Sequence, residues 1–172
     1  MQKGLTFIIR QITNRLFTKD KIMSTVQNLL AGLGGAIALN ILHETLKKFS
    51  DDTPRIDILG EEALQKGIEY AGGKHIPKNE LYAPTLGADL LSNTLYYSMI
   101  GAGNSKHVWP KAIALGLAAG SGAIALPEPM GLNPEPVDKN MKVRAMTVGY
   151  YLFGALVTAC ILETTSKKKL KW

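Results

Sequence analysis

The stretch from Ile22 to Leu42, IMSTVQNLLAGLGGAIALNIL, contains no charged residue over 21 positions. A helix of about 20 apolar residues covers the roughly 30 Å of hydrocarbon in a bilayer. A surface helix of a soluble protein needs a polar stripe facing water, and this stretch lacks one. It therefore predicts a membrane-spanning helix, which we place at residues 22–46.

Three further stretches lack charged residues: Leu90–Ser105 and Ala112–Pro127, with 16 residues each, and Ala145–Leu162, with 18. The two shorter ones need flanking polar residues or local thinning of the bilayer to complete a span. We predict an all-α fold with a single domain, an integral membrane four-helix bundle whose other spans cover 86–105, 109–128 and 143–165. The alternative is a soluble bundle of buried helices.

The overall composition does not decide between these classes. Apolar residues make up 46% of the 172 residues, charged residues 20%, and the mean hydropathy is only +0.04. The formal net charge of +6 is concentrated at the two ends of the chain, which fits a membrane surface better than nucleic acid. We therefore expect the lipid bilayer, and no nucleic acid, as a partner. The only cysteine, Cys160, is interpreted as a small buried filler.

The N-terminal segment 4–20 has the pattern of an amphipathic helix. Apolar residues recur at helical spacing among basic ones, at Leu5, Ile8, Ile9, Ile12 and Leu16. A helix of this kind lies flat in the headgroup region of a membrane. We predict an interfacial helix here, and a helix docked against protein is the alternative.

The distribution of lysine and arginine predicts the orientation. Both the N-terminal arm and the tail at 166–172 are basic, so an even number of spans places both termini in the cytoplasm. The loop at 47–85, with a short helix at 58–71, is then expected outside, as is the loop at 129–142. The latter also carries Lys139 and Lys142, which runs against this rule.

A short internal sequence repeat suggests a duplicated helical hairpin. Gly35–Leu39 reads GAIAL, and Gly122–Leu126 repeats it. The alternative is that helices rich in glycine and alanine resemble each other by composition. Small residues let membrane helices approach closely, so we expect spans one and three to touch through the glycines Gly32, Gly35, Gly116, Gly120 and Gly122.

A few polar residues lie at the predicted outer ends of the spans. Asn40, His43 and Glu44 share one face at the end of span one, and ionisable groups near a span often mark a pathway for ions or protons. The alternative is a solvated helix end. The other candidates for a polar or ion site are Asp89 and Asn93 at the start of span two and Glu128 at the end of span three. A duplication would bring Glu44 and Glu128 into one vestibule.

The segment from Gly116 to Gly120, running on to Pro129-Met130-Gly131-Leu132-Asn133-Pro134, resembles the small YagU-like bacterial inner-membrane proteins. Those proteins have a glycine-rich span that ends in a Pro-x-Met-Gly-Leu-x-Pro stretch, whereas Pro129 here directly precedes Met130. The resemblance covers about 20 of the 172 residues. It implies a multi-span protein of the bacterial inner membrane linked to acid stress, without assigned catalytic residues.

No catalytic, phosphate-binding or dinucleotide-binding motif occurs in the sequence, and no second histidine stands at metal-ligand spacing. We therefore expect no enzyme, no cofactor and no metal site. The first functional hypothesis is a structural, stress-related or accessory membrane protein that forms a homo-oligomer or joins a membrane complex. The second is a small ion- or proton-coupled transporter or channel that uses His43 and the outer carboxylates.

Overall fold

The computed structural model describes residues 19–50, 52–103 and 107–169, and no strand occurs among them. The prediction of an all-α fold is therefore confirmed for these residues. The interfacial helix predicted at 4–20 lies outside them except for its last two residues. In chain order the elements are α2 (Lys19–Leu46), α3 (Ile56–Tyr70), α4 (Lys78–Ser98), the 3-10 turn η1 (Met99–Gly101), α5 (Val108–Ala125), α6 (Glu135–Asp138) and α7 (Met141–Lys169).

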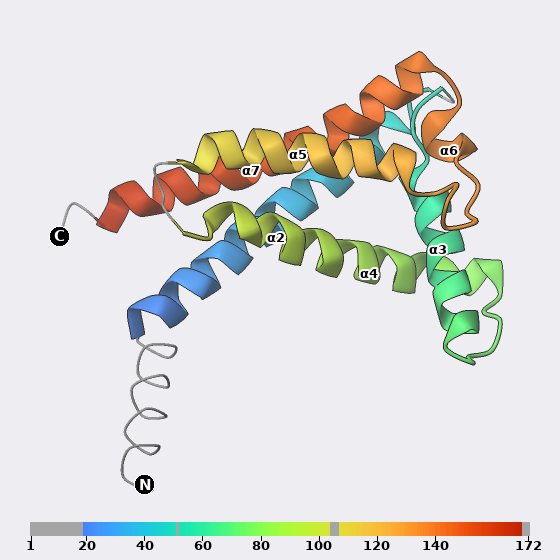
Figure 1. Ribbon diagram of the computed structural model, residues 1–172, viewed down its shortest axis with the longest axis horizontal. Coiled ribbons are helices and arrows are strands. Elements are labelled where there is room, and N and C mark those ends of the chain that lie inside the picture. The colour runs from blue at the N-terminus through green and yellow to red at the C-terminus, as the bar shows by residue number, and fades with distance from the viewer. Residues whose placement is uncertain (1–18, 51, 104–106, 170–172) are drawn as a thin grey trace, which may run out of the picture.

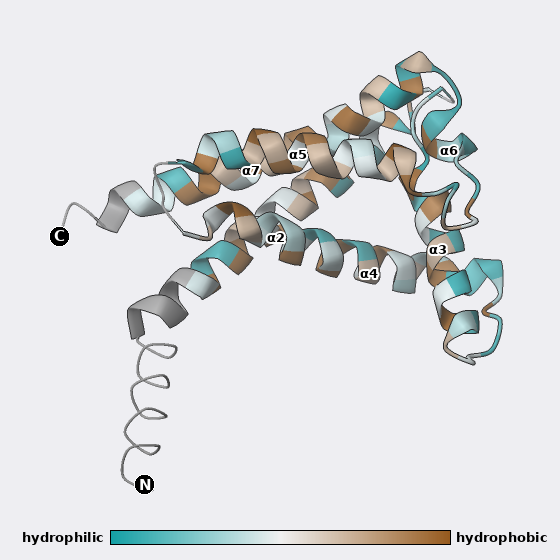
Figure 2. Cartoon of the chain, in the orientation of Figure 1, coloured by the Kyte–Doolittle hydropathy of each residue, from teal (hydrophilic) through white to brown (hydrophobic). Residues whose placement is uncertain are grey.

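Among the residues that the structure describes, three helices are long and apolar enough to cross a membrane: Thr25–Leu46 within α2, Val108–Ala125 (α5) and Met141–Ser166 within α7. Figure 2 shows apolar residues along these helices, whereas hydrophilic residues gather around α3 and α6. Three of the four predicted spans are thus confirmed as candidate membrane helices. The fourth, which falls on α4, stays a prediction.

The helix at the second predicted span begins and ends earlier in the chain than expected. We expected a span at 86–105 after a loop, but α4 begins at Lys78, directly after Pro77, and contains Pro84. Pro84 stands six residues after the start of α4, so it removes the backbone hydrogen bond to the carbonyl of Glu80, and its ring crowds that carbonyl and favours a kink. The early start brings Lys78 and Glu80 into the helix, and α4 is not among the described helices that are apolar enough to cross a membrane.

The four long helices pack in pairs (Figure 1). α2 packs against α4, α5 packs against α7, and α2 also packs against α7, whereas α2 and α5 barely touch. α3 and α6 lie together at one end of these helices, which we call the α3 end. The first residue of α2 and the last of α7 lie toward the opposite end. This is the arrangement of two helical hairpins, each with a short helix in its connection.

The contact expected between spans one and three is wrong, because α7 contacts both and separates them. A side chain on Gly35 of α2 would meet Thr158 and Gly154 of α7. Gly120 of α5 faces the backbone of Val148, also on α7. The glycines do permit close approach of helix backbones, as membrane helices require. Gly116 of α5 also faces α7, whereas Gly32 of α2 faces the backbone of Thr94 and Ser98 on α4.

The main core lies where the helices approach most closely. Fully buried residues from five elements fill it, and they include Ala31, Ala36, Tyr97, Ile100, Ala112, Ala155 and Ala159. The Tyr97 hydroxyl donates a hydrogen bond of 2.9 Å to the carbonyl oxygen of Tyr151, and this bond ties α4 to α7. A smaller apolar cluster of Leu59, Leu132 and Val137 lies between α3 and the loop that contains α6. Cys160 is exposed, so its interpretation as a buried filler is wrong.

Candidate functional site

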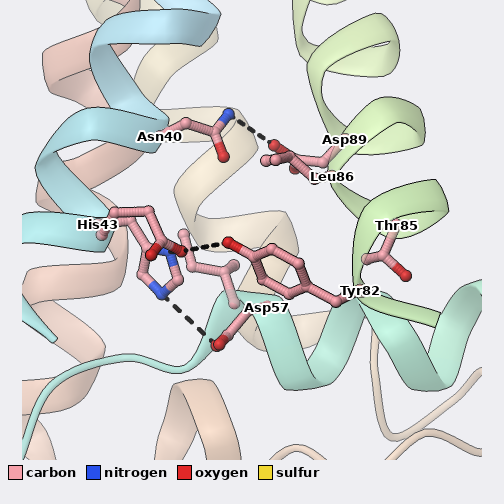
Figure 3. A pocket seen from close by; sticks show the side chains of 10 residues that line it. Asn40, His43, Asp57, Tyr82, Thr85, Leu86 and Asp89 are labelled. Carbon is pink, nitrogen blue, oxygen red and sulfur yellow. Dashed lines mark hydrogen bonds and ion pairs between the residues drawn. The ribbon is translucent and has the colours of Figure 1, made fainter. Parts of the chain in front are cut away.

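A pocket of about 30 Å³ lies between α2, α3 and α4 near the α3 end (Figure 3). Figure 3 shows Asn40 and His43 on α2 facing Tyr82 and Asp89 on α4, with Asp57 on α3 beneath them. The complete lining is Asn40, His43, Glu44, Ile56, Asp57, Gly60, Tyr82, Thr85, Leu86 and Asp89. Four of the six residues predicted from the sequence therefore line one cavity.

Asp89 is held by two amide side chains. Nδ2 of Asn40 donates to its Oδ2 at 2.9 Å, and Nδ2 of Asn93 donates to its Oδ1 at 2.8 Å. Asn93 stands one helical turn after Asp89, so the fifth predicted residue contacts the pocket through this carboxylate. The Asn40 bond links α2 to α4 across 49 positions of sequence. Asp89 therefore fixes the distance between the two helices as well as lining the pocket.

His43 is the most deeply buried ionisable side chain of the site, with 3% of its surface exposed. Its Nε2 lies 3.6 Å from Oδ1 of Asp57, and its Nδ1 lies 3.7 Å from Oε1 of Glu44. The edge of its ring approaches Tyr150 on α7, with 6.1 Å between the ring centres. Nε2 has no hydrogen-bond partner among the described residues. The imidazole thus stands between two carboxylates without a hydrogen bond from Nε2 to either.

An ion-pair network surrounds Glu44 and Asp57, two of the residues that line the pocket. Nζ of Lys47 lies 2.6 Å from Oε1 of Glu44 and 3.2 Å from Oδ2 of Asp57. Arg55 donates two hydrogen bonds of 2.9 Å to the Asp57 carboxylate, and the Tyr82 hydroxyl donates one of 3.1 Å to Glu44. Such charge-assisted bonds are stronger than bonds between neutral groups. The network therefore links α3 to the ends of α2 and α4.

The charges of this network act on the pKa values of its members outside the spans. Partial burial raises the pKa of Asp57, but the hydrogen bonds and the charge of Arg55, together with the charge of Lys47, outweigh burial and lower this pKa to about 2. Burial lowers the pKa of Lys47, but Glu44 and Asp57 outweigh it and raise this pKa above its usual value. Asp57 and Lys47 are consequently ionised throughout the neutral pH range.

Glu128, the sixth predicted residue, does not join the site. It lies after the end of α5 and is exposed, and it is not among the residues that line the pocket. The expected vestibule of Glu44 and Glu128 is therefore not formed. Gly122, which corresponds to Gly35 in the repeated GAIAL sequence, also has different surroundings. The nearest atom to a side chain built at Gly122 belongs to Leu126 of the same segment, at 3.6 Å, whereas Gly35 lies against α7.

Sequence reasoning missed Tyr82 and Thr85, because we assigned residues 47–85 to the outer loop and began the span at 86. The available signal was Pro77, since proline often stands at the start of a helix. A helix from that point places Tyr82, Thr85 and Asp89 at spacings of three and four residues, on one face. Asp57 is one of the aspartates that follow span one in the sequence. It lies near His43 only because α3 packs against α4.

No protein-family model matches the chain, and neither a curated protein nor a solved structure does. The resemblance to YagU-like proteins stays a prediction, and the site is interpreted from its own chemistry.

Proposed function

We propose that the chain is a small multi-pass protein of the bacterial inner membrane with a structural or accessory role and no enzymatic activity. In this proposal α4 crosses the bilayer as a fourth span of a helical bundle, and both termini lie in the cytoplasm. The bundle forms a homo-oligomer or is one subunit of a membrane complex. A role under stress would agree with the resemblance described above.

The observation that supports a structural role is the closely packed centre of the molecule. Ala31 and Ala36 of α2 and Ala155 and Ala159 of α7 are completely buried, and Tyr97 fills the space beside them. Contacts between small residues are the main source of stability for helices in lipid, where hiding apolar surface contributes little. The pocket of about 30 Å³ lies at the α3 end and is far below the several hundred Å³ typical of organic ligands.

A second candidate is a proton- or ion-coupled transporter or channel, and the position of His43 favours it. A buried imidazole between Asp57 and Glu44 is an arrangement that can accept and release a proton. Ionisable groups in or near membrane spans frequently mark such pathways. Asp89, farther along α4, would be the next group on a path into the membrane.

Flux measurements on reconstituted protein separate the two candidates. Liposomes that contain the purified chain are given a pH gradient, and proton entry is followed with an internal dye, alongside liposomes with Glu44→Gln and empty liposomes. The structural role predicts equal flux in all three preparations. Faster flux with the wild-type chain, reduced by Glu44→Gln, would replace the structural role by transport.

A further inference from the structure

Three large apolar side chains near the α3 end are strongly exposed. Phe49 is 80% exposed, Met141 75% and Met130 64%, and among the described residues Tyr70 is the only large apolar side chain that is more exposed than these. Apolar residues that are exposed singly are common on proteins. These three differ from such isolated cases because they share one position relative to the candidate membrane helices.

Each of the three side chains stands where a different candidate membrane helix begins or ends. Phe49 comes shortly after the last residue of α2, Met130 comes shortly after the last residue of α5, and Met141 is the first residue of α7. The connections from these helix ends run to α3 or α6, which lie together at the α3 end (Figure 1). The apolar side chains therefore stand at the level where the three helices would leave the hydrocarbon.

Lysines accompany two of these side chains. Lys48 directly precedes Phe49, and Lys139 stands shortly before Met141. Both lysines are exposed, and neither forms an ion pair with another residue that the structure describes. Met130 differs in this respect, because the charged residue that shortly precedes it is an exposed acid, Glu128. Two of the three helix ends thus combine an exposed apolar group with an uncompensated positive charge.

The boundary layer of a bilayer can accommodate this combination. There, apolar groups reach the upper acyl chains, while the ammonium groups of lysines extend to the phosphates of the lipids. Water offers no such contact, because apolar surface left in water is unfavourable. A lipid layer also surrounds a membrane protein on all sides and therefore reaches all three helix ends.

We propose that this end of the molecule is anchored in the headgroup layer, with Phe49, Met130 and Met141 among the upper acyl chains. Lys48 and Lys139 bind the phosphate groups of anionic lipids there. The inference rests on the membrane-spanning arrangement proposed above, and it adds the level at which the bilayer ends and the class of lipid at that level. It also gives Lys139, which runs against the positive-inside rule, a partner on the outer side.

Fluorescence quenching by brominated lipids tests the level of the boundary. Both native tryptophans are replaced, by Trp109→Phe and Trp172→Phe, and single tryptophans are introduced as Phe49→Trp, Met141→Trp or Ile37→Trp. The full chain is reconstituted in liposomes whose lipids carry bromine either near the headgroup or near the bilayer centre. We expect the first two to be quenched more by the shallow bromine. Ile37, which is 42% exposed near the middle of the α2 span, should be quenched more by the deep one.

The same fluorescence reports the class of lipid. Phosphatidylglycerol and phosphatidylcholine, each brominated near the headgroup, are compared at equal fractions. We expect about fivefold enrichment of the anionic lipid beside Phe49→Trp and Met141→Trp, which corresponds to about 1 kcal/mol for one lysine near the membrane surface. Adding Lys48→Gln or Lys139→Gln should return the enrichment at the neighbouring tryptophan to about one. Met130→Trp should show no enrichment with either lysine in place.

The outcomes separate this inference from the proposed function. If the deep bromine fails to quench Ile37→Trp, α2 does not cross the bilayer, and the proposed function fails together with the anchor. Quenching of Ile37→Trp without quenching of Phe49→Trp and Met141→Trp would leave the spans in place and overturn the anchor, and a protein partner would then be the candidate for these side chains. Enrichment that is absent, or that persists without the lysines, would overturn the binding of anionic lipid. Lys74→Gln removes an exposed lysine between α3 and α4 and is the matched control, which should change neither measurement.

Discussion

At the scale of single residues, the absence of a side chain at Gly35 allows α2 to lie directly on α7. A methyl group on Gly35 would overlap the Thr158 hydroxyl and the carbonyl of Gly154. We predict that Gly35→Ala destabilises the protein by about 1–3 kcal/mol, the usual cost of overpacking a tight contact. Unfolding of the purified protein in mixed detergent micelles, followed by circular dichroism, measures this change.

Gly122→Ala provides the control for this prediction, since a side chain at Gly122 meets nothing closer than Leu126 at 3.6 Å. Alanine is better than glycine within a helix by up to about 1 kcal/mol, so this variant should be as stable as the wild type or more stable. Equal effects of the two substitutions would mean that the close contact between α2 and α7 does not contribute as described.

From the sequence, site residues could be grouped only by their spacing along a single helix. Asn40, His43 and Glu44 could be grouped because they share a helix face, and Asp89 with Asn93 for the same reason. The partner of each glycine could not be predicted, because small residues indicate close packing without indicating which helix approaches. The exposure of Cys160 was missed for a related reason, since an apolar span does not show which of its faces is turned to lipid.

At the scale of elements, the packing of α3 against α2 and α4 depends on the ionisation of Asp57. Asp57 has a pKa near 2 in the folded chain and an ordinary value of 3.8 when free, so its contribution is complete above about pH 4. As the pH falls from about 4 to about 2 the carboxylate is protonated and the contribution, about 2 kcal/mol at most, is lost. Arg55 and Lys47 face this group and stay positive in that range, and the ring of His43 faces it as well. We predict that α3 loosens from α2 and α4 in this interval.

Spin labels at two exposed positions, Tyr70→Cys on α3 and Met141→Cys on α7, can measure this in a Cys160→Ser background. The distance distribution between them should be narrow above pH 4 and broaden toward pH 2. In Asp57→Asn the added broadening should be smaller, while Glu62→Gln controls for a neighbouring carboxylate that also binds this end of the molecule. Identical pH profiles for Asp57→Asn and the wild type would contradict the assignment.

Most elements were predictable because each is a local pattern in the sequence. The short helix expected at 58–71 is α3 at 56–70, and it ends before Gly72, whose φ of 82° suits glycine. α4 was predicted less well, because its first residues are polar and were assigned to a loop. The relative position of α3 and α4, which creates the pocket, depends on contacts between distant residues such as Gly60 and Thr85, and no local pattern encodes them.

At the scale of the whole molecule, the arrangement of the helices makes a prediction about the two sides of the membrane. α3 lies at one end of the long helices, and the last turns of α7 lie at the other (Figure 1). In the proposed orientation, which follows the positive-inside rule, the second end with its basic termini faces the cytoplasm. A membrane-impermeant maleimide should therefore label Glu61→Cys on α3 in intact spheroplasts and should label Ser166→Cys on α7 only after the membrane is opened. Both variants carry Cys160→Ser.

The pattern of labelling distinguishes the ways in which this topology can fail. Reversed labelling would leave the fold intact and invert its orientation, and the pocket would then open to the cytoplasm. Labelling of both positions in intact spheroplasts would mean that α7 does not cross the bilayer, although Met141–Ser166 is apolar enough to do so. The pocket between α2, α3 and α4 lies on the outer side of the membrane only in the predicted orientation, so the result also decides which compartment the pocket faces.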